Sequence, residues 1–412
     1  MIQAIAKRVA GLDVHQVMVM ATLLYEDNQG EIKKETREYK TFPNDLKRLA
    51  IWLKQAEVEL IVMESTGIYW KTVYEAMEDE ELKSYVVNAR FIKNVPGRKT
   101  DIMDSEWLAE LGRCGLLRPS FIPPRDIREL RLLTRYRMKL MSIYGCEKNR
   151  LTKVLEASGI KLGCIVSDID GVSARRMVEA ILEGKEPKDI AKLAIGKLKR
   201  KEQELIQALE NYRLSGPSRF VLNEILSHIK WLEIRLDQID EEVVSAMKPY
   251  EVEWQLLQTI PGINRISAAM LVSEIGVDMS CFKSKEHLSS WAGMCPGNNE
   301  SAGKKKSGKT RKGNKYIGSL LCECANSTRN TTSQFKGMYQ GLVIRRGHKR
   351  AIVALGHKLL EIIYVILKNK KPYKDPIVNY EEMAVKKNAP RWIQTLKKYG
   401  YISEAGIKQN VN

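Results

Sequence analysis

The most constraining feature of the sequence is a run of apolar residues between Pro217 and Met247 whose spacings alternate between three and four. The residues of this seam are Leu222, Ile225, Ile229, Leu232, Leu236, Ile239 and Val243. Such a heptad pattern predicts a helix whose narrow apolar stripe is buried against another helix. The partner can be a helix of the same chain, in an antiparallel hairpin, or the same helix of a second subunit. Because the seam is narrow and strict, we favour a dimeric coiled coil.

The first 120 residues alternate between strand and helix patterns. The expected elements are strands over residues 9–24 and 40–42, a helix over 43–56, a strand over 60–63, a helix over 67–77 and a strand over 85–87. This order predicts an α/β sheet layer that opens with a hairpin. A long helix over 126–157 follows, and helices are expected over 315–330 and 349–368. The predicted domains are residues 1–125, a helical linker 126–250, a mostly helical domain 251–370 and a polar tail 371–412.

Four carboxylates lie at the ends of the elements in the α/β region. Asp13 lies within the first strand and Glu64 closes the buried strand, while Asp101 and Asp104 share one face at the start of a helix. Several hard oxygen ligands that converge on one point are what a Mg²⁺ site needs. The ordinary alternatives are helix N-terminal acids for Asp101 and Asp104, and a turn residue for Glu64. Asp13 is harder to explain in this way, because a charge inside a core strand is costly without a partner.

A basic loop from Gly293 to Asn314 carries a single central hydroxyl, Ser301. Between Gly297 and Lys315 there are seven Lys or Arg residues and one acid, a local charge of +6. Such a serine can be a nucleophile toward a phosphodiester, because the cations offset the charge that builds up during attack. The alternative is a solvated loop that only touches nucleic acid.

The whole chain is basic, with 68 Lys and Arg against 50 Asp and Glu, which favours a nucleic-acid partner. A basic stripe on the long helix and a helix, Pro-Gly-Ile-Asn turn, helix pattern at 256–276 are candidate phosphate-binding features, although a solvated helix face and a plain αα-hairpin have the same patterns. The candidate contacts are Arg98, Lys99, Arg128, Arg131, Arg135, Lys139, Gly262, Asn264, Arg265, Lys304, Lys305, Lys306, Lys309, Arg311, Lys312, Arg345, Arg346, Lys349 and Arg350.

The seven cysteines have no paired metal-ligand spacing and no disulfide pattern, which suits a reducing cytoplasm. The first residues do not have the composition of a signal peptide. No apolar run reaches about 18 residues, so we expect no membrane span.

Five stretches together resemble the transposases of the insertion sequence 110 family. They are GLDVH, VMESTGIYW, NARFIKNVPGRKTDIMDSEWLAELGRCGLLRPSFIP, the PGIN hairpin and GMCPGNNESAGKKKSGKTRKGN. The resemblance covers nearly the whole chain. It implies an RNase H or RuvC-like N-terminal domain and a C-terminal transposase domain with a helix-hairpin-helix-like element. The family's DEDD positions fall on Asp13, Glu64, Asp101 and Asp104, and its serine falls on Ser301.

The resemblance also implies a mechanism. The carboxylates would bind Mg²⁺, and Ser301 would attack the scissile phosphate to give a 5′-phosphoserine and a free 3′-OH. Strand exchange between donor and target DNA would follow, through a Holliday-type intermediate, within a dimer of dimers whose active sites form between subunits. A structured non-coding bridge RNA would choose both DNAs, in the cytoplasm of a bacterium or archaeon, close to the nucleoid.

Two departures from the family pattern are Met294, where Leu is common, and Ile317-Gly318, where an apolar residue followed by Arg is expected. Neither involves the five proposed catalytic positions. Two other hypotheses remain: a RuvC-like metal nuclease or junction resolvase that forms no serine adduct, and a non-enzymatic, RNA-bound DNA-binding protein.

Overall fold

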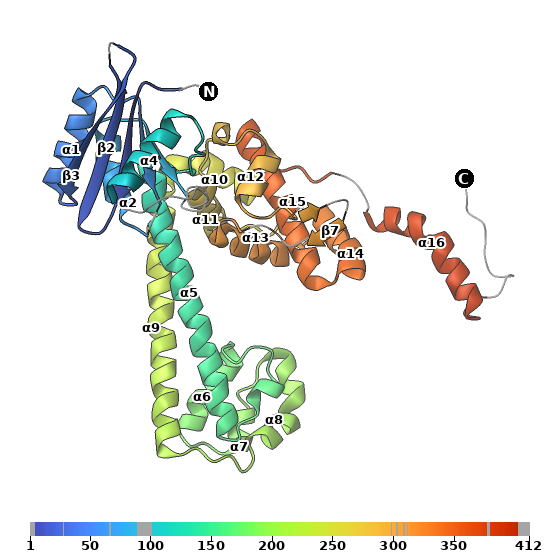
Figure 1. Ribbon diagram of the computed structural model, residues 1–412. Coiled ribbons are helices and arrows are strands. Elements are labelled where there is room, and N and C mark those ends of the chain that lie inside the picture. Colours follow the sequence, from blue (N-terminus) through green and yellow to red (C-terminus); the bar gives the residue numbers. More distant parts are fainter. Residues whose placement is uncertain are drawn as a thin grey trace. The chain divides into compact units, whose positions relative to one another are not determined.

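The structure is a computed structural model that describes residues 5–27, 29–65, 67–88, 101–297, 299–301, 304–307, 310, 312–376 and 380–402. Within these ranges, the side chains of residues 101–102, 299–301, 304–307, 380–384 and 387 are not described. The chain divides into two compact units, Met1–Ile122 and Pro123–Asn412. Figure 1 shows the helices and strands of both units.

The first unit is built on a five-stranded mixed sheet with the order β3-β2-β1-β4-β5. The strands are β1 (Arg8–Val14), β2 (Met18–Glu26), β3 (Ile32–Lys40), β4 (Leu60–Glu64) and β5 (Ser84–Val87). β1, β2 and β3 form an antiparallel meander, and β4 and β5 run parallel to β1. The predicted α/β layer that opens with a hairpin is therefore confirmed.

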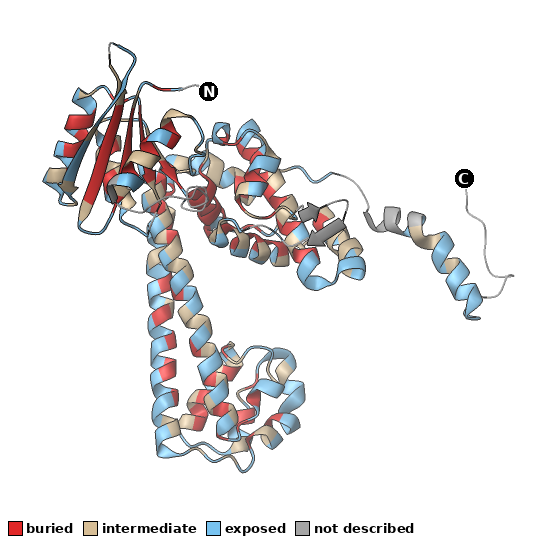
Figure 2. Cartoon of the chain, viewed as in Figure 1, coloured by how far each residue is buried: buried red, intermediate tan, exposed pale blue. Residues whose placement is uncertain are grey.

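Helices cover both faces of this sheet. Ala10, Leu12 and Val14 belong to the core that contains α1 (Pro43–Gln55) and α2 (Trp70–Asp79). Val9 packs on the opposite face, in a cluster with Leu108 of α4 (Asp101–Arg113). Figure 2 shows the buried central strands and the exposed outer sides of the helices. Since alternate residues of a strand point to opposite faces, the odd-numbered residues of β1 point toward α4.

β3 was not predicted, because almost all of its residues are polar, and the strand expected at 40–42 was wrong, since only Lys40 of it belongs to β3. It pairs with β2 over nine residue pairs at the edge of the sheet. Arg37 lies over the ring of Trp52 on α1, at 4.5 Å from the centroid, and Lys34 donates to Glu106 on α4 at 3.0 Å. Charged side chains at an edge strand disfavour pairing with another chain, so the polar composition suits the position.

The second unit begins with two long helices that pack side by side, α5 (Arg125–Ala157) and α9 (Gly216–Ala246). Leu140 packs with Leu232 and Leu236, whereas Leu151 and Leu155 share a core with Leu222. This order of contacts makes the pair antiparallel. The preference for a seam between subunits was therefore wrong: α5 of the same chain already buries these heptad positions, and the alternative of an intrachain hairpin holds.

Residues 158–215 form a small helical insertion at the far ends of α5 and α9. Its elements are η1 (Leu162–Cys164), α6 (Val172–Leu182), α7 (Pro187–Ala191), η2 (Gly196–Lys201) and α8 (Glu202–Leu209). Apolar residues from all of the α-helices pack into one core with Leu151, Leu155 and Leu222. The insertion is thus a folded body that is held on the two long helices.

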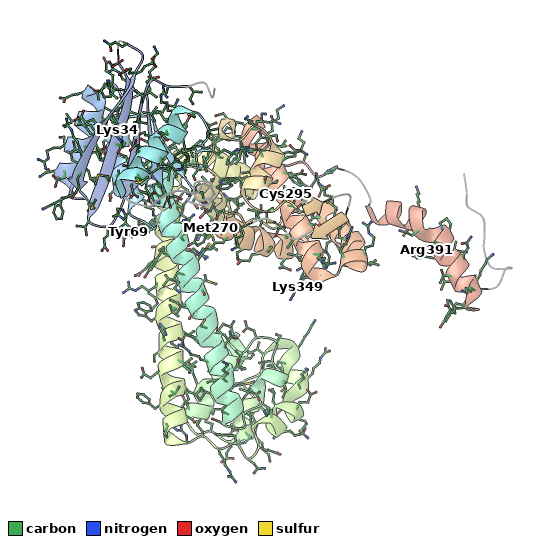
Figure 3. All side chains as sticks on the ribbon, viewed as in Figure 1. Lys34, Tyr69, Met270, Cys295, Lys349 and Arg391 are labelled. Carbon is green, nitrogen blue, oxygen red and sulfur yellow. The ribbon has the colours of Figure 1, made fainter. Side chains whose placement is uncertain are left out.

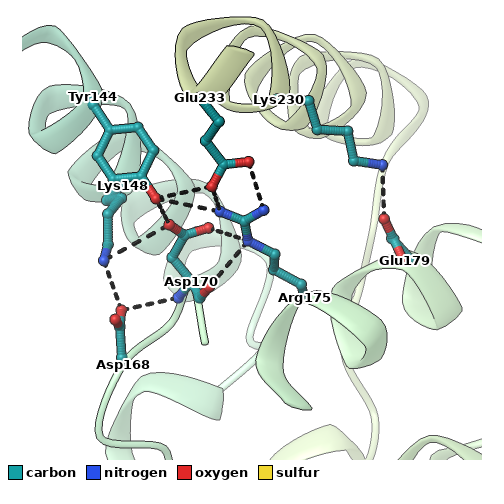
Figure 4. A network of polar contacts seen from close by, with 8 residues as sticks. All are labelled: Tyr144, Lys148, Asp168, Asp170, Arg175, Glu179, Lys230 and Glu233. Carbon is teal, nitrogen blue, oxygen red and sulfur yellow. Dashed lines mark hydrogen bonds and ion pairs between the residues drawn. The ribbon is translucent and has the colours of Figure 1, made fainter. Parts of the chain in front are cut away.

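A polar network also fastens the insertion to the long helices (Figure 4). Arg175 of α6 donates to Asp170 at 2.6 Å and to Glu233 of α9 at 2.8 Å. The hydroxyl of Tyr144 on α5 donates to the same Asp170. These charge-assisted bonds raise the pKa of the Arg175 guanidinium and lower the pKa of the Glu233 carboxyl.

The rest of the second unit is mostly helical. Its elements are η3 (Lys248–Tyr250), α10 (Glu251–Gln258), α11 (Arg265–Ile275), η4 (Met279–Cys281), α12 (Lys285–Trp291), β6 (Asn299–Ser301), β7 (Lys304–Ser307), α13 (Lys315–Thr328), α14 (Gln334–Arg346), α15 (His348–Asn369) and α16 (Tyr380–Lys398). The predicted helices at 315–330 and 349–368 correspond to α13 and α15, whereas α14 and α16 were not predicted. Among the helices in the described ranges, none has the length and hydropathy that a membrane span requires.

Candidate active site

The carboxylates of the first unit lie where two parallel strands end. β1 and β4 pair in parallel up to Leu12 and Met63, so Asp13 and Glu64 are the next residues of two neighbouring strands. Val9 and Val62 point toward α4, and strand alternation places Asp13 and Glu64 on that same face. Both side chains are partly buried, and 16% of the Asp13 side chain is exposed.

α4 approaches β1 very closely, and this contact brings the helix start to the same end of the sheet. A Cβ on Gly11 would lie 2.0 Å from the carbonyl oxygen of Ser105, so only glycine fits there. A Cβ on Gly112, further along α4, would meet Val62 and Val9 instead. α4 therefore runs opposite to β1, with its N-terminus toward the Asp13 end.

Asp104 is exposed in the first turn of α4, directly before the buried Ser105. Ser105 hydrogen bonds to Thr22 at 2.7 Å, which fixes the start of the helix over the β1–β2 pair. Asp101 is the first residue of α4, and its side chain lies outside the described set. The His15 ring hydrogen bonds to Asp13, with Nε2 3.0 Å from Oδ2.

The donor set at this end of the sheet is chemically suited to a hard divalent cation. Asp13 and Glu64 offer carboxylate oxygens from adjacent strands, and α4 begins on the same side. Among the described residues, no group of three or more acidic, His or Cys side chains is close enough to hold a metal ion. The side chain of Asp101 lies outside the described set, so the fit rests on the two strand carboxylates and the position of α4.

Ser301 lies in a short hairpin that the sequence did not predict. β6 and β7 pair antiparallel with Ser301 opposite Lys304. Pro296, before β6, and Thr310, after β7, form an isolated antiparallel β-bridge. A Cβ on Gly313 would lie 2.3 Å from the Gly293 nitrogen, so the two ends of the loop meet backbone to backbone. The side chains of Ser301, Lys304, Lys305 and Lys306 are outside the described set, as are Lys309 and Arg311 entirely.

A buried acid holds the exit of this loop. Glu274 is 3% exposed and accepts from Arg135 at 2.8 and 2.9 Å, and it also accepts from the side-chain amide of Asn314. Asn314 in turn caps α13 by accepting from the backbone N–H of Tyr316 at 3.0 Å. The loop therefore leaves the Ser301 hairpin at a point that is tied to α5 and α11.

Two residues of the predicted basic stripe on α5 have other roles. Arg131 donates to the carbonyl oxygens of Ser273 and Glu274 at 2.9 and 2.8 Å, near the C-terminus of α11. Burial lowers the pKa of Arg131 to about 10, and the nearby Glu274 partly offsets this effect. Arg135 is held by Glu274. The prediction that Arg131 and Arg135 bind phosphate is therefore weakened, because the Nε and one Nη of each arginine already donate to groups of the same chain.

The other predicted contacts lie in several places. Lys139 is exposed on α5, and Arg128 is partly buried and donates to the Pro123 carbonyl at 3.0 Å. In the Pro-Gly-Ile-Asn turn, Asn264 uses its side chain to cap α11 by accepting from Ser267 N–H. The remaining exposed residues are Gly262, Arg265, Lys312, Arg345, Arg346, Lys349 (Figure 3) and Arg350. Arg98 and Lys99 lie outside the described residues.

The turn at Gly262 is exposed on one side and packs closely against the end of α13 on the other. Gly262 has a φ of +87°, and a Cβ there would lie 2.6 Å from the Thr328 nitrogen at the end of α13. The Thr328 hydroxyl is 2.9 Å from the Pro261 carbonyl. The glycine is thus required by its backbone conformation and by a close contact with α13.

Reasoning from the sequence missed Glu274, Asn314, His15 and Gly11. His15 had a usable signal, because it comes two residues after Asp13, directly beyond the end of the strand, and residues i and i+2 of extended chain share a face. Asn314 at the start of an apolar helix is a typical N-cap, which the pattern also contained. Glu274 had no comparable signal, because its partners lie far away in the sequence.

Two family models match the chain. A model described as "Transposase", whose name marks it as a DEDD transposase of IS110, matches residues 10–159. A second, described as "Transposase IS116/IS110/IS902 family", matches residues 254–340. Residues 160–253 lie outside both matches.

Curated relatives agree with these matches. The transposase for insertion sequence element IS1111A of Coxiella burnetii is 28% identical over 178 residues, which is 42% of this chain and 48% of the relative. A putative transposase of Sinorhizobium fredii is 28% identical over 149 residues, 35% of this chain and 38% of the relative. The chain thus spans about half or less of the length of these two relatives.

Among solved structures, Thermus thermophilus RuvC matches with a TM-score of 0.23 and 14% identity. The same protein in complex with a Holliday junction substrate matches with a TM-score of 0.22 and 13% identity. Each match covers 27% of this chain and 99% of the other. At TM-scores this low, the strand order described above remains the better description of the fold.

Proposed function

Because the chain belongs to the insertion sequence 110 family of transposases, we propose that it is a DNA recombinase with two chemical parts, the carboxylates of the first unit and the serine hairpin of the second. The observation that carries the proposal is the strand register, which places Asp13 and Glu64 side by side on the face that α4 covers. Core positions in parallel strands are otherwise apolar, so two adjacent carboxylates there are expected to bind a cation or another partner that offsets their charge.

In this proposal, Asp13, Glu64, Asp101 and Asp104 hold Mg²⁺ and thereby position the scissile phosphate. The bound cation would supply neutralisation of the charge on the phosphate oxygens. Gly11 and Ser105 set the position of α4, and so the distance between Asp104 and the strand carboxylates. His15, bonded to Asp13, orients that carboxylate.

Ser301 is the proposed nucleophile. Its Oγ forms a bond to phosphorus while the bond from phosphorus to the 3′ oxygen breaks, which leaves a 5′-phosphoserine and a free 3′-OH. The Ser301 proton is lost and the 3′ oxygen gains one, so the step needs no oxidant or further reactant. Because the phosphodiester is exchanged for another ester, its energy is kept for rejoining to a new strand.

The partners follow from the same proposal. Donor and target duplex DNA are the substrates, and a bridge RNA from the element selects them, with the exposed cations of α14 and α15 among the contacts. The first unit would be RuvC-like and the α10–α11 turn helix-hairpin-helix-like, in a cytoplasmic, nucleoid-associated protein. A dimer that assembles to a tetramer would have to use a surface other than the heptad seam, which α5 already covers.

The test is a cleavage and exchange assay on a supercoiled plasmid that carries the native flanks of the gene, with RNA transcribed from those flanks. Ser301→Ala should abolish covalent protein–DNA adducts on a denaturing gel and lower strand exchange by at least about a thousandfold. Ser307→Ala, in the paired strand of the same hairpin, is the matched control and should keep adducts. Asp13→Asn should abolish cleavage, whereas Asp45→Asn, on α1 at the other face of the sheet, should not.

Each outcome separates the hypotheses. If Ser301→Ala cuts DNA at the normal rate, the chain is a metal nuclease or junction resolvase and the serine assignment is wrong. If Asp13→Asn and Asp104→Asn both recombine normally, the carboxylates are not catalytic and the third hypothesis, a non-enzymatic nucleic-acid-binding protein, returns.

A further inference from the structure

The helical insertion has no role in the proposed reaction. Almost all of it lies in the stretch 160–253, between the two family matches, and its core is shared with the ends of α5 and α9. The insertion contributes neither a carboxylate nor the serine of the proposed site. Its surface is therefore available for a separate binding function.

That surface is strongly basic over one short segment. Between Lys185 and Lys201 there are seven Lys or Arg residues and two acids, a local charge of +5, and all seven cations are exposed. The seven are Lys185, Lys188, Lys192, Lys197, Lys199, Arg200 and Lys201. We call this segment the basic edge.

Some of these cations already have partners. Lys185 pairs with Glu183 at 2.6 Å, Lys192 with Asp189 at 2.9 Å, and Lys201 more loosely with Glu204 at 3.9 Å. Within the described parts of the chain, no ion pair is found for the other four, three of which lie on the single 3-10 helix η2. Like charges this close repel one another, and a polyanion relieves that repulsion.

The basic edge borders an open hollow of about 600 Å³. Lys197 and Lys201 line it, together with the apolar side chains of Val172, Ile195 and Leu198. Val172 is 64% exposed and Ile195 is 47% exposed, so the apolar wall is open to an incoming group. This volume is within the range of sites that enclose a small organic group.

Cations beside an apolar hollow fit a nucleic-acid strand with an unpaired base better than they fit a duplex. A duplex presents phosphates while its bases stay stacked, so it would use the lysines and leave the hollow unused. A single strand or a loop can place a base against apolar side chains while its phosphates lie along the cations. Asp168 also lines the hollow, where its carboxylate can accept from a base amino group.

We propose that the basic edge and its hollow form a binding site for an unpaired segment of nucleic acid, with phosphates on Lys197, Lys199 and Arg200 and one unstacked base against Val172 and Ile195. The site is separate from the proposed recombinase chemistry. Binding can therefore be measured without cleavage, and either proposal can fail alone.

The test uses the full chain and two fluorescent probes of the same stem sequence: an RNA hairpin with an unpaired loop, and the fully paired duplex without the loop. Lys197→Glu with Arg200→Glu should weaken hairpin binding by about tenfold or more and reduce the slope of log affinity against log salt by about 1 to 2. Lys185→Glu with Lys192→Glu makes the same change in net charge at paired lysines, and should weaken binding by no more than about twofold.

Two further measurements address the hollow. Val172→Ser with Ile195→Ser removes the apolar wall without a change in charge, so it should weaken hairpin binding and leave duplex binding unchanged. Photo-cross-linking from a 5-iodouridine in the loop should label the peptide around residues 195–201. Equal losses in both charge-reversal pairs, equal binding of hairpin and duplex, or a cross-link only elsewhere in the chain would each overturn the proposal.

Discussion

The buried acid Glu274 should be a major determinant of the stability of the second unit. Its side chain is 3% exposed and accepts two bonds from Arg135 and one from Asn314, and it lies 3.7 Å from the Arg131 Nε. Glu274→Ala would leave these donors without that acceptor. Removal of one partner from a buried ion pair costs about 3–5 kcal/mol, much of it for the charge that is left behind.

The exposure of the two arginines narrows this range of expected destabilisation. The Arg135 side chain is 33% exposed and can regain water, whereas the Arg131 side chain is 15% exposed and keeps its bonds to two carbonyl oxygens. The cost of Glu274→Ala should therefore be near the lower end, about 3 kcal/mol. Glu274→Gln keeps the shape and one acceptor oxygen, so it should cost about 1–2 kcal/mol.

The measurement is urea unfolding followed by far-ultraviolet circular dichroism, with attention to separate transitions for the two units. Glu323→Ala, on the exposed side of α13, changes the charge equally and should stay within about 0.5 kcal/mol of the parent. Limited proteolysis should also cut Glu274→Gln faster near the Ser301 hairpin, because Asn314 loses its anchor. If Glu274→Ala were as stable as Glu323→Ala, the role given to this acid would be refuted.

Two further predictions concern the long helices and the sheet. Leu232→Glu places a charge on a seam position that is 1% exposed in the single chain, so it should lower the unfolding free energy by more than about 3 kcal/mol. The mass measured by light scattering should not fall before the protein unfolds. Clean conversion of an oligomer to folded monomers would instead favour a seam between subunits. Gly11→Ala should displace α4 and abolish cleavage, because the Cβ would lie 2.0 Å from the Ser105 carbonyl oxygen. The control is Gly145→Ala on α5, whose Cβ would meet nothing within 4 Å and which should stabilise the helix by about 0.5–1 kcal/mol. An active, stable Gly11→Ala protein would contradict the close contact.

The parts of the fold that the sequence predicted well are those in which burial dictates composition. β4 and α5 have apolar patterns that leave little choice of structure, and their observed bounds agree with the expectations. β3 was missed because it is the edge strand of the sheet, where both faces of a strand can carry polar residues. The β6–β7 hairpin was missed because its residues are Gly, Asn, Ser and Lys, which also occur in irregular loops.

The residues of the candidate site also divide into those that the sequence indicated and those that it did not. Asp13 stood out in the sequence because a charge in a core strand is costly, and its neighbour Glu64 follows from the parallel register. The basic stripe on α5 was misleading for Arg131 and Arg135, because spacing along one helix says nothing about what packs against it. Their partner Glu274 lies about 140 residues away in a helix whose other residues are nearly all buried.

The spacing of the heptad seam likewise did not reveal which helix packs against it, and the identity of that helix links the two ends of the second unit. Its pattern required a helical partner, and the partner is α5, a single helix of 33 residues and so about 50 Å long. Near its start, α5 holds Glu274 and thus the exit of the serine hairpin, and near its end, Leu151 and Leu155 enter the core of the insertion. A strand bound at the basic edge would therefore be linked through one helix, which packs against α9, to Asn314 at the exit of the serine loop. The length of that helix is a geometric constraint on any nucleic acid that contacts both places.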